Sequence, residues 1–594
     1  MKRLLIVLLA LTLAMSWLPM KAAQAASLLK TDDGLEFQFG MAQKVQFHTI
    51  SGLDFTDNPE RNFRSLSVPD ITIGNQPLSI WNFTNLLFTL SKGPVSVHAN
   101  LEVEAAMDER VADVNHLNLE RANLTWKTGV IGDLVVGFDV HLFDPEGGLI
   151  YQDEDPGIWL IGSNGPFSWN VGYHKRLQKN RGNQLGLGGV AAPFSIATNP
   201  ANHDANIVEA RVGFNLPVPG GNLSISPLFL YYGRHVPQGG TNPDDLAVGT
   251  VGNLAACPSG ATGSPCTSGA FNPNVADNSK ADIYFPGIVL GGKLGPLNVT
   301  VEGVGQFGDI ENLSAANFGF SKMNFQSFAA FGEVSLDLTA QGIGLTPFVN
   351  VDYRSGDDNP FDDELKGYVA ISDLSSALRK DGAKFQSISS LGPPTLGAGG
   401  EAAWGFNTGG RGTGPTIGSI IDDISLGSSV FFNNRFGKAD NPGLIKISGG
   451  VLGKITPQVD MKASVSYLRF DTTEPIRAEA AINRLSRGIT DGSVGVGGCA
   501  GVSAVGGPRS DRVKCVVDNL EVDHDMGIEV NFNIGWSPVP AFRIQPFASF
   551  FIPLHGADDI NGLFLGSTPV VKGQEAGKET RAAYIAGIEF RAQF

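Results

Sequence analysis

The chain has 594 residues, of which 42% are hydrophobic and 17% charged, and its formal net charge at pH 7 is −16. A net negative charge without a dominant basic patch argues against a nucleic-acid-binding protein. The 75 glycines, the 37 phenylalanines and a mean hydropathy of +0.01 are unusual for a soluble protein. They suit strands that are apolar on one face and polar on the other.

The first 25 residues have the pattern of a secretory signal peptide. Lys2 and Arg3 precede an apolar run over 4–18, and residues 23–25 read Ala-Gln-Ala, an A-x-A cleavage site. A membrane-anchoring helix fits less well, because the apolar core is short. We therefore predict export of a mature chain spanning 26–594, in which no later apolar run is long enough for a transmembrane helix.

Alternation of apolar and polar residues predicts about 18 strands in the mature chain. In the clearest, 95–106, apolar residues from Val95 to Ala105 face one way, and Ser96, His98 and Glu102 face the other. Eleven residues or so is the length that a tilted strand needs to cross a bilayer. The predicted strands are 35–48, 80–91, 95–106, 117–127, 132–142, 157–162, 167–176, 205–216, 222–234, 282–293, 297–307, 325–338, 344–354, 444–454, 458–469, 524–536, 541–552 and 581–594.

The connections between these strands alternate between short turns and long polar loops. That asymmetry is typical of outer-membrane barrels, which have short periplasmic turns and long extracellular loops. A further alternating piece, 425–435, would make the count odd, so we assign it to a loop. Pro227, Pro347 and Pro546 fall inside predicted strands, where each removes a ladder donor. The long loops are 49–79, 107–116, 143–156, 177–204, 235–281, 308–323, 355–443, 470–523 and 553–580.

The last strand, RAAYIAGIEFRAQF, ends on a carboxyl-terminal Phe594. It resembles the final strand of Gram-negative outer-membrane β-barrels, in which the terminal aromatic residue belongs to the assembly signal. The resemblance implies an all-β, transmembrane, antiparallel up-and-down barrel in the outer membrane. It also implies contact with outer-membrane lipid and lipopolysaccharide and with the outer-membrane assembly machinery. We expect this strand to pair with 35–48, so that no sheet edge remains.

The polar faces of the strands predict the lining of the barrel lumen. Charged side chains are costly in lipid, so they are expected to face water or one another. Both signs occur on these faces, which predicts a mixed lumen. The alternative for any single charge is a salt bridge within the wall that has no part in selectivity. The predicted lining residues are Glu102, Glu104, Arg121, Asp139, Arg176, Glu209, Arg211, Arg234, Glu302, Glu333, Asp337, Asp352, Arg354, Glu529, Arg543 and Glu589.

The long loop 355–443 is the predicted constriction of the lumen, and its first residues are acidic. Residues 353–358, Tyr-Arg-Ser-Gly-Asp-Asp, resemble a segment of alginate-export-type and related porins. That family implies a cationic path for a polyanion, and the mixed lumen departs from it. Clustered carboxylates can bind Ca²⁺, but the register of a dedicated calcium loop is missing, so a solvated acidic loop is favoured. The carboxylates are Asp357, Asp358, Asp362, Asp363 and Glu364.

The four cysteines fall in two local pairs. Cys257 and Cys266 share one Gly-rich segment, and Cys499 and Cys515 share another. Export to an oxidising compartment favours two short-range disulfides within loops. Metal ligation is the alternative, but neither pair has CxxC spacing or a close histidine.

Together these patterns predict a porin, in which small hydrophilic solutes or ions diffuse through a water-filled barrel. The nine histidines form no HExxH motif and no Ser-His-Asp setting, so we predict neither an enzyme nor a cofactor beyond that calcium alternative. The other functions left open are a substrate-specific exporter of alginate type, a closed structural or adhesin barrel, and a barrel-embedded hydrolase. A homo-oligomer fits the same patterns.

Overall fold

The structure is a computed structural model of the whole chain, and it describes most of the predicted strands and part of the loops. The predicted signal peptide, the piece 425–435 and Phe594 lie outside the described residues. The described residues are 29–51, 63–64, 72–73, 76–108, 111–176 except 145 and 147, 205–235, 280–312, 321–371 except 369, 442–478, 481, 499, 511–564 and 582–593.

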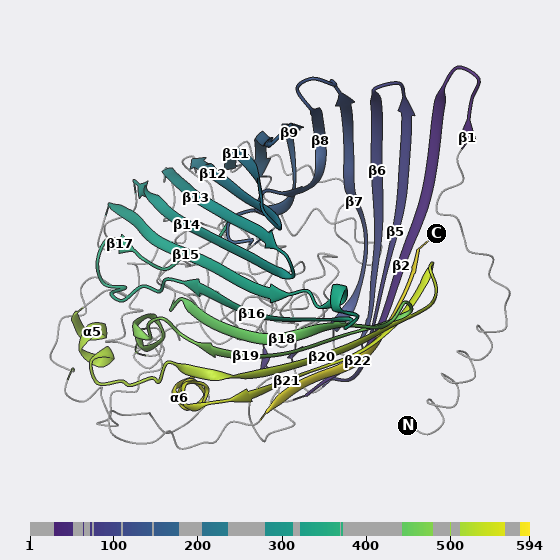
Figure 1. Ribbon diagram of the computed structural model, residues 1–594. Helices are drawn as coiled ribbons and strands as arrows, with labels where there is room; N and C mark the ends of the chain where they lie inside the picture. The colour runs from purple at the N-terminus through teal and green to yellow at the C-terminus, as the bar shows by residue number, and fades with distance from the viewer. Residues whose placement is uncertain are drawn as a thin grey trace, which may run out of the picture.

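The main sheet has 20 strands, and without the two-residue strands β1 and β17 it is a ring of 18 (Figure 1). Each strand of the ring pairs antiparallel with its neighbours along the chain. These strands are β2 (Leu35–Ser51), β5 (Gln76–Lys92), β6 (Val95–Asp108), β7 (Val111–Lys127), β8 (Asp133–Leu142), β9 (Gln152–Asn164), β10 (Phe167–Arg176), β11 (Ala205–Val218), β12 (Gly221–His235), β13 (Lys280–Leu294), β14 (Leu297–Glu311), β15 (Lys322–Leu336), β16 (Leu345–Arg354), β18 (Leu444–Thr456), β19 (Val459–Arg469), β20 (Asp525–Val539), β21 (Phe542–Pro553) and β22 (Ala583–Gln593).

The first and last strands of the ring close the barrel. β2 and β22 pair antiparallel from Ala42↔Gln593 to Ser51↔Tyr584. Residues 35–41 pair only with β5 and, at Glu36 and Phe37, with β1 (Leu29–Lys30). The predicted closure is therefore confirmed, but it uses the second half of β2 and runs beyond the predicted end at residue 48. The closed ring has no free edge between its first and last strands.

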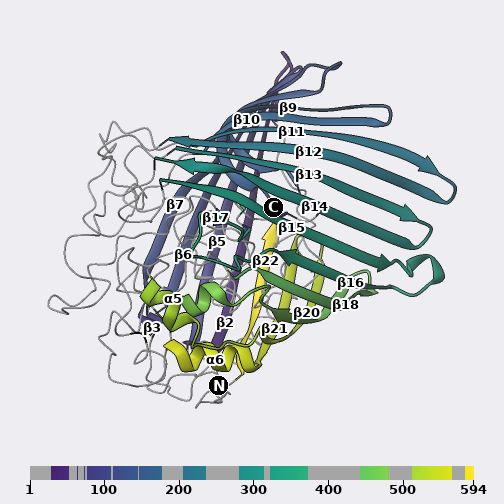
Figure 2. The same cartoon turned by 90° about the vertical axis from the view of Figure 1, so that its left-hand side faces the viewer.

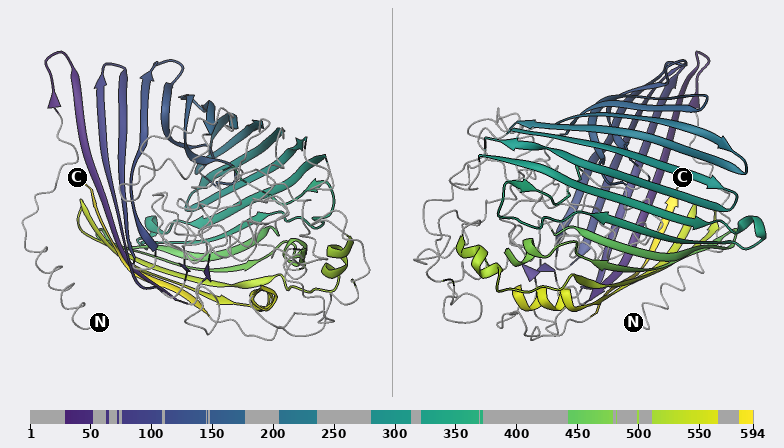
Figure 3. Two further views of the ribbon diagram at one scale, coloured as in Figure 1. Left: turned by 180° about the vertical axis from the view of Figure 1, so that it is seen from behind. Right: turned by 60° about the vertical axis from the view of Figure 1, so that its left-hand side comes forward.

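The other described elements are short and are not strands of the ring. β17 (Glu364–Leu365) pairs parallel with β15, and β3 (Phe63–Arg64) pairs with β4 (Thr72–Ile73). The 3₁₀ helix η2 (Thr339–Gln341) lies in the turn between β15 and β16. The helices α5 (Asp511–Val517) and α6 (His555–Phe564) lie near each other at one end of the barrel (Figures 2 and 3). No described helix is long and apolar enough to cross a membrane.

All 18 predicted barrel strands are present, with bounds that differ by a few residues. One predicted loop, 107–116, is wrong. β6 continues to Asp108 and β7 begins at Val111, so the strands extend through most of that range. The polar residues there gave a loop pattern, but backbone pairing of β6 with β7 continues to Asp108↔Val111.

The three strand prolines lie where the ladder is interrupted. Pro227 pairs with Ile288 of β13, but the pairing of β12 with β11 skips it. Pro347 pairs with Val451 of β18 and lies just past the last pair of β16 with β15. Pro546 pairs with β22 and is skipped in the pairing with β20. Because proline has no N–H to donate, each is tolerated at a gap in the ladder on one side.

The outer face of the barrel is apolar. Large side chains that point outward from strands on different parts of the ring are strongly exposed, with relative exposures of 47% for Trp126, 43% for Val301, 48% for Phe328 and 57% for Val349. A soluble monomer rarely exposes a continuous apolar surface of this kind. A closed barrel with such an outer band is the form in which strands cross a lipid bilayer.

Candidate channel lining and constriction

Part of the inner face is apolar, which strict alternation does not predict. On β12 and β13 the outward residues Phe229 and Tyr284 are 43% and 41% exposed, whereas the inward Leu230 and Phe285 are fully buried. These inward residues belong to a buried cluster that continues across β14 and β15. Apolar side chains on the inner wall need a cover, and two segments between strands supply it.

The first covering segment is 143–151, between β8 and β9. Its turn is held by Asp144, whose carboxylate accepts hydrogen bonds from the amides of Ile150 (2.7 Å) and Tyr151 (3.1 Å). Arg211 of β11 anchors the turn to the wall, with two forked contacts of 2.9 and 2.6 Å to the Glu146 carboxylate. Such bidentate pairs are strong and fix geometry, so this segment is tied to the inner wall.

The second covering segment is 355–371, the first part of the predicted constriction loop. The chain turns back after β16, and β17 pairs with Asn324 and Phe325 of β15 beyond the end of β16. The Ser355 hydroxyl donates to the carbonyl of Lys366 (2.7 Å), and the amide of Tyr368 donates to the carbonyl of Ser355 (2.9 Å). The start of the predicted constriction loop is therefore folded back toward β15 and the end of β16, and the constriction itself stays a prediction.

The two segments meet over the inner wall. The Tyr368 hydroxyl donates to the carbonyl of Leu149 (2.7 Å), and the amide of Ile371 donates to the carbonyl of Ile150 (2.9 Å). All four residues are fully buried and belong to the same apolar cluster as the wall. The segments follow strands that are far apart in the ring, β8 and β16, and their junction lies against the inner wall.

The acidic residues of the second segment are used in local contacts. Asp357 is fully buried and accepts hydrogen bonds from the amides of Asn359 and Lys366. Lys366 makes ion pairs of 3.1 Å with both Asp358 and Glu364, and the hydrogen bond with Asp358 is the main cause that raises the pKa of Lys366. Calcium binding by this segment stays a prediction.

The predicted lining residues divide into buried and water-exposed groups. The described strands carry Glu102, Glu104, Arg176 and Arg234, but their side chains are outside the description. The nearly buried members, at 7% exposure or less, are Glu209, Glu302, Glu333, Asp352, Arg354, Glu529 and Glu589. The more exposed members are Arg121, Asp139, Arg211, Asp337 and Arg543, with side-chain exposures between 17% and 45%.

The structure brings several lining residues together as pairs of opposite charge. Arg121 of β7 lies 3.3 Å from Asp139 of β8. Arg354 and Asp352 form a buried pair of 3.1 Å on β16. Asp337 lies 3.7 Å from Lys293, at the short-turn end of the barrel. The lining is therefore mixed in sign, and much of it is engaged in wall contacts.

Pairing in space also supplies partners that periodicity alone does not single out. Asp460 of β19 receives a forked contact from Arg543, at 2.6 and 2.7 Å, and Arg591 pairs with Glu589. Tyr368 and Leu149 were not predicted to meet. One feature of the sequence indicates that this part of the inner wall is covered. In β12, five successive apolar residues, 228–232, leave no polar face for a lumen.

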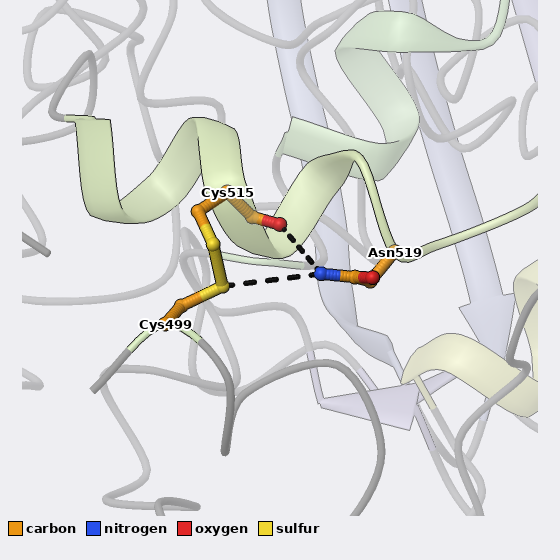
Figure 4. Close-up of a disulfide and its surroundings, with 3 residues drawn as sticks. All are labelled: Cys499, Cys515 and Asn519. Carbon is orange, nitrogen blue, oxygen red and sulfur yellow. Dashed lines mark hydrogen bonds between the residues drawn. A yellow bond between two sulfur atoms is a disulfide. The ribbon is translucent and has the colours of Figure 1, made fainter. Parts of the chain in front are cut away.

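The cysteine pair at 499 and 515 forms a disulfide, as expected for loops in an oxidising compartment. It joins Cys499 to α5, and the side-chain amide of Asn519 donates to the carbonyl of Cys515 (2.9 Å; Figure 4). The pair Cys257 and Cys266 lies outside the described residues.

The fold and the lining together define an integral β-barrel of the outer membrane, apolar outside and charged inside.

Among solved structures, the chain is similar to Pseudomonas putida OprB, with 9% identity, a TM-score of 0.41 and coverage of 94% of each chain. It is also similar to Pseudomonas aeruginosa OccD3 (OpdP), with 8% identity, a TM-score of 0.41 and coverage of 96% of this chain and 94% of that one. The outer membrane channel DcaP of Acinetobacter baumannii matches with 10% identity, a TM-score of 0.35 and coverage of 95% and 99%. No family model and no curated protein sequence matches the chain. At these TM-scores the similarity supports no conclusion about function. A function is therefore argued only from the residues and geometry of the barrel.

Proposed function

We propose that the chain is a porin, through which small hydrophilic solutes and ions diffuse passively across the outer membrane. The observation that carries this proposal is the opposite chemistry of the two faces of one wall. Leu124 of β7 points outward and is 42% exposed, whereas Arg121 on the same strand points inward and its side chain, 45% exposed, pairs with Asp139. Barrels of 16–18 strands leave an aqueous channel unless loops fill it.

The constriction at Leu149 and Tyr368 sets the size limit in this proposal. Charged residues of both signs remain partly exposed on the inner face, for example Arg121 at 45% and Asp460 at 43%. A wall of mixed sign suits small solutes of either charge better than one polyanion. Export of an alginate-type polysaccharide is therefore the weaker proposal.

Solute uptake into proteoliposomes tests the porin. Uptake of neutral sugars is expected to fall steeply with sugar size, and a polyuronate is expected neither to enter nor to compete. Competition by the polyuronate at low concentration would instead support the export channel. A further expectation, from the net charge of −16, is a mild cation preference. A reversal potential showing anion preference in a salt gradient would contradict that part.

A closed structural barrel is the second candidate, favoured by one observation. Several inward charges, among them Glu302 and Glu529, are fully buried rather than water-exposed. Folded barrel that inserts into liposomes but admits no sugar of any size would support this candidate. Lipopolysaccharide contact, the assembly machinery and a homo-oligomer stay predictions under either function.

A further inference from the structure

Three side chains with metal-binding chemistry meet on the inner face of the barrel. His141 of β8, His174 of β10 and Glu209 of β11 are 3%, 0% and 0% exposed, and their ligating atoms all lie within 4.8 Å of one another. The two imidazole rings have centroids 4.4 Å apart. Within the described part of the chain, this is the one place where three such groups gather.

The three groups converge on one carboxylate oxygen, Oε1 of Glu209. Nε2 of His174 lies 3.3 Å from Oε1 of Glu209, and Nε2 of His141 also contacts this oxygen. Both oxygens of Glu209 and both nitrogens of His174 nevertheless lack a hydrogen-bond partner of good geometry. A buried carboxylate in that condition is costly. Two ligands at about 2.1 Å from a tetrahedral zinc ion are roughly 3.4 Å apart. The His174–Glu209 distance agrees with this spacing, whereas Nε2 of His141 lies closer to Glu209 and has to move away from it to ligate an ion.

The residue beside the ligating atoms on β10 is Gly172, which carries no side chain. A Cβ on Gly172 would lie 2.9 Å from both Oε1 of Glu209 and Nε2 of His174, so glycine keeps this position open. The ring of Trp159 stacks on His174 with centroids 5.3 Å apart, and Tyr151 lies 5.7 Å from His174 on another side. An aromatic, water-poor shell of this kind strengthens the binding of a cation by charged and imidazole ligands.

We propose that His141, His174 and Glu209 bind one divalent transition-metal ion of the zinc type. Two imidazoles and one carboxylate are a ligand set that zinc uses in proteins, and imidazole does not suit Ca²⁺ or Mg²⁺. The ion neutralises the buried carboxylate and gives Nε2 of His174 and the Glu209 carboxylate a partner. It also joins three strands, β8, β10 and β11.

The position of the site gives the ion a structural role. His141 lies two residues before Phe143, where the first covering segment begins, and Arg211, which anchors that segment, follows Glu209 on β11 by two residues. A bound ion therefore fixes the base of the constriction to the wall. This role does not require that the barrel conduct.

The test uses the full mature chain, folded in detergent without a polyhistidine tag and stripped with a chelator. Titration with Zn²⁺ is expected to give one tight site per chain. Glu209→Gln and His174→Gln are each expected to weaken that site by at least about tenfold. His98→Gln is the matched control, because His98 is also an inward strand histidine but contacts only Thr89 and Ser96 among the described side chains. It is expected to bind Zn²⁺ like the wild type.

A second measurement does not depend on the variants folding. X-ray absorption of the Zn²⁺-loaded wild-type chain is expected to show two imidazole nitrogens and a carboxylate oxygen around the ion. Stoichiometry below one site, or Zn²⁺ binding unchanged in both ligand variants, would overturn the proposal and leave a hydrogen-bonded His-Glu-His cluster. Both measurements are made in detergent and do not depend on conductance. A failure of the zinc site can therefore be distinguished from a failure of the porin function.

Discussion

At the scale of single residues, the type of side chain depends on which face of the strand it occupies. Gly535 of β20 illustrates how strictly the inner face is packed. The Arg543 guanidinium passes over Gly535 to reach Asp460, so that one ion pair spans three neighbouring strands. A Cβ on Gly535 would lie 1.9 Å from Nη2 of Arg543. A side chain at this position would displace the guanidinium, whereas the backbone conformation of Gly535 is not one that favours glycine.

Gly535→Ala is expected to displace the Arg543 guanidinium and to break its two contacts with the Asp460 carboxylate, without removing a charge. Both partners are partly exposed, so the free energy of unfolding should fall by only about 1 kcal/mol. Urea unfolding of the barrel in lipid vesicles measures this change. Gly303→Ala is the control, because a Cβ at that strand glycine would meet nothing within 4 Å. Equal losses in the two variants would show that the ion pair is not the cause.

Asp559 on α6 predicts a pH dependence outside the barrel strands. Burial raises the pKa of Asp559 from its ordinary value of 3.8 to about 6, and the nearby carboxylates of Asp523 and Asp558 add to the shift. Between these pKa values the folded state holds more protons than the unfolded state. Stability therefore decreases as pH rises from about 4 to about 6, and it is greatest below that window.

The amide of Asp523 donates to Oδ2 of Asp559 at 2.7 Å, and it reports on this contact. Its hydrogen-exchange protection factor is expected to be higher at pH 5 than at pH 7. Asp559→Asn is expected to remove the difference, because the amide side chain still accepts the hydrogen bond but does not titrate. A pH effect that survives in Asp559→Asn would assign it to another group.

At the scale of the elements, the strands were predictable and the covering segments were not. Most barrel strands follow from a local period of two, because each needs only an apolar outside and a polar or small inside. The junction of 143–151 with 355–371 depends on contacts between residues more than 200 positions apart. No local period encodes such a contact. The apolar run 228–232 was the one local sign that the inner wall there is covered.

The same limit applied to the candidate site. The polar faces gave the lining residues, but they did not show which charges meet. His141, His174 and Glu209 lie on three different strands, so their convergence depends on strand register and on the side-chain directions of a closed ring. Pairing in the ladder, not sequence spacing, brings them together.

Tyr368→Phe tests the junction of the two covering segments. The substitution leaves the buried carbonyl of Leu149 without this donor, which costs about 1–3 kcal/mol of local stability. More frequent fluctuations of the open-channel current are expected, because the segments separate more easily. Tyr173→Phe is the control, since Tyr173 also loses a 2.7 Å hydroxyl bond, to Asn206, but on the outer face. Equal current noise in both variants would contradict a constriction at Tyr368.

At the scale of the whole molecule, closure of the ring is the central feature. Pairing of β2 with β22 leaves the 18-strand ring without an open edge, and a spanning β structure in lipid needs that closure. The apolar band then meets lipid and the charged face is turned inward. Every proposal about transport depends on whether water and ions pass along that inward face.

Single-channel recording of the purified wild-type barrel in planar lipid bilayers tests this most directly. The account predicts discrete, stable conductance steps on insertion, with a mild preference for cations in a salt gradient. Insertion of demonstrably folded barrel without any conductance steps would contradict the porin and leave a closed structural barrel.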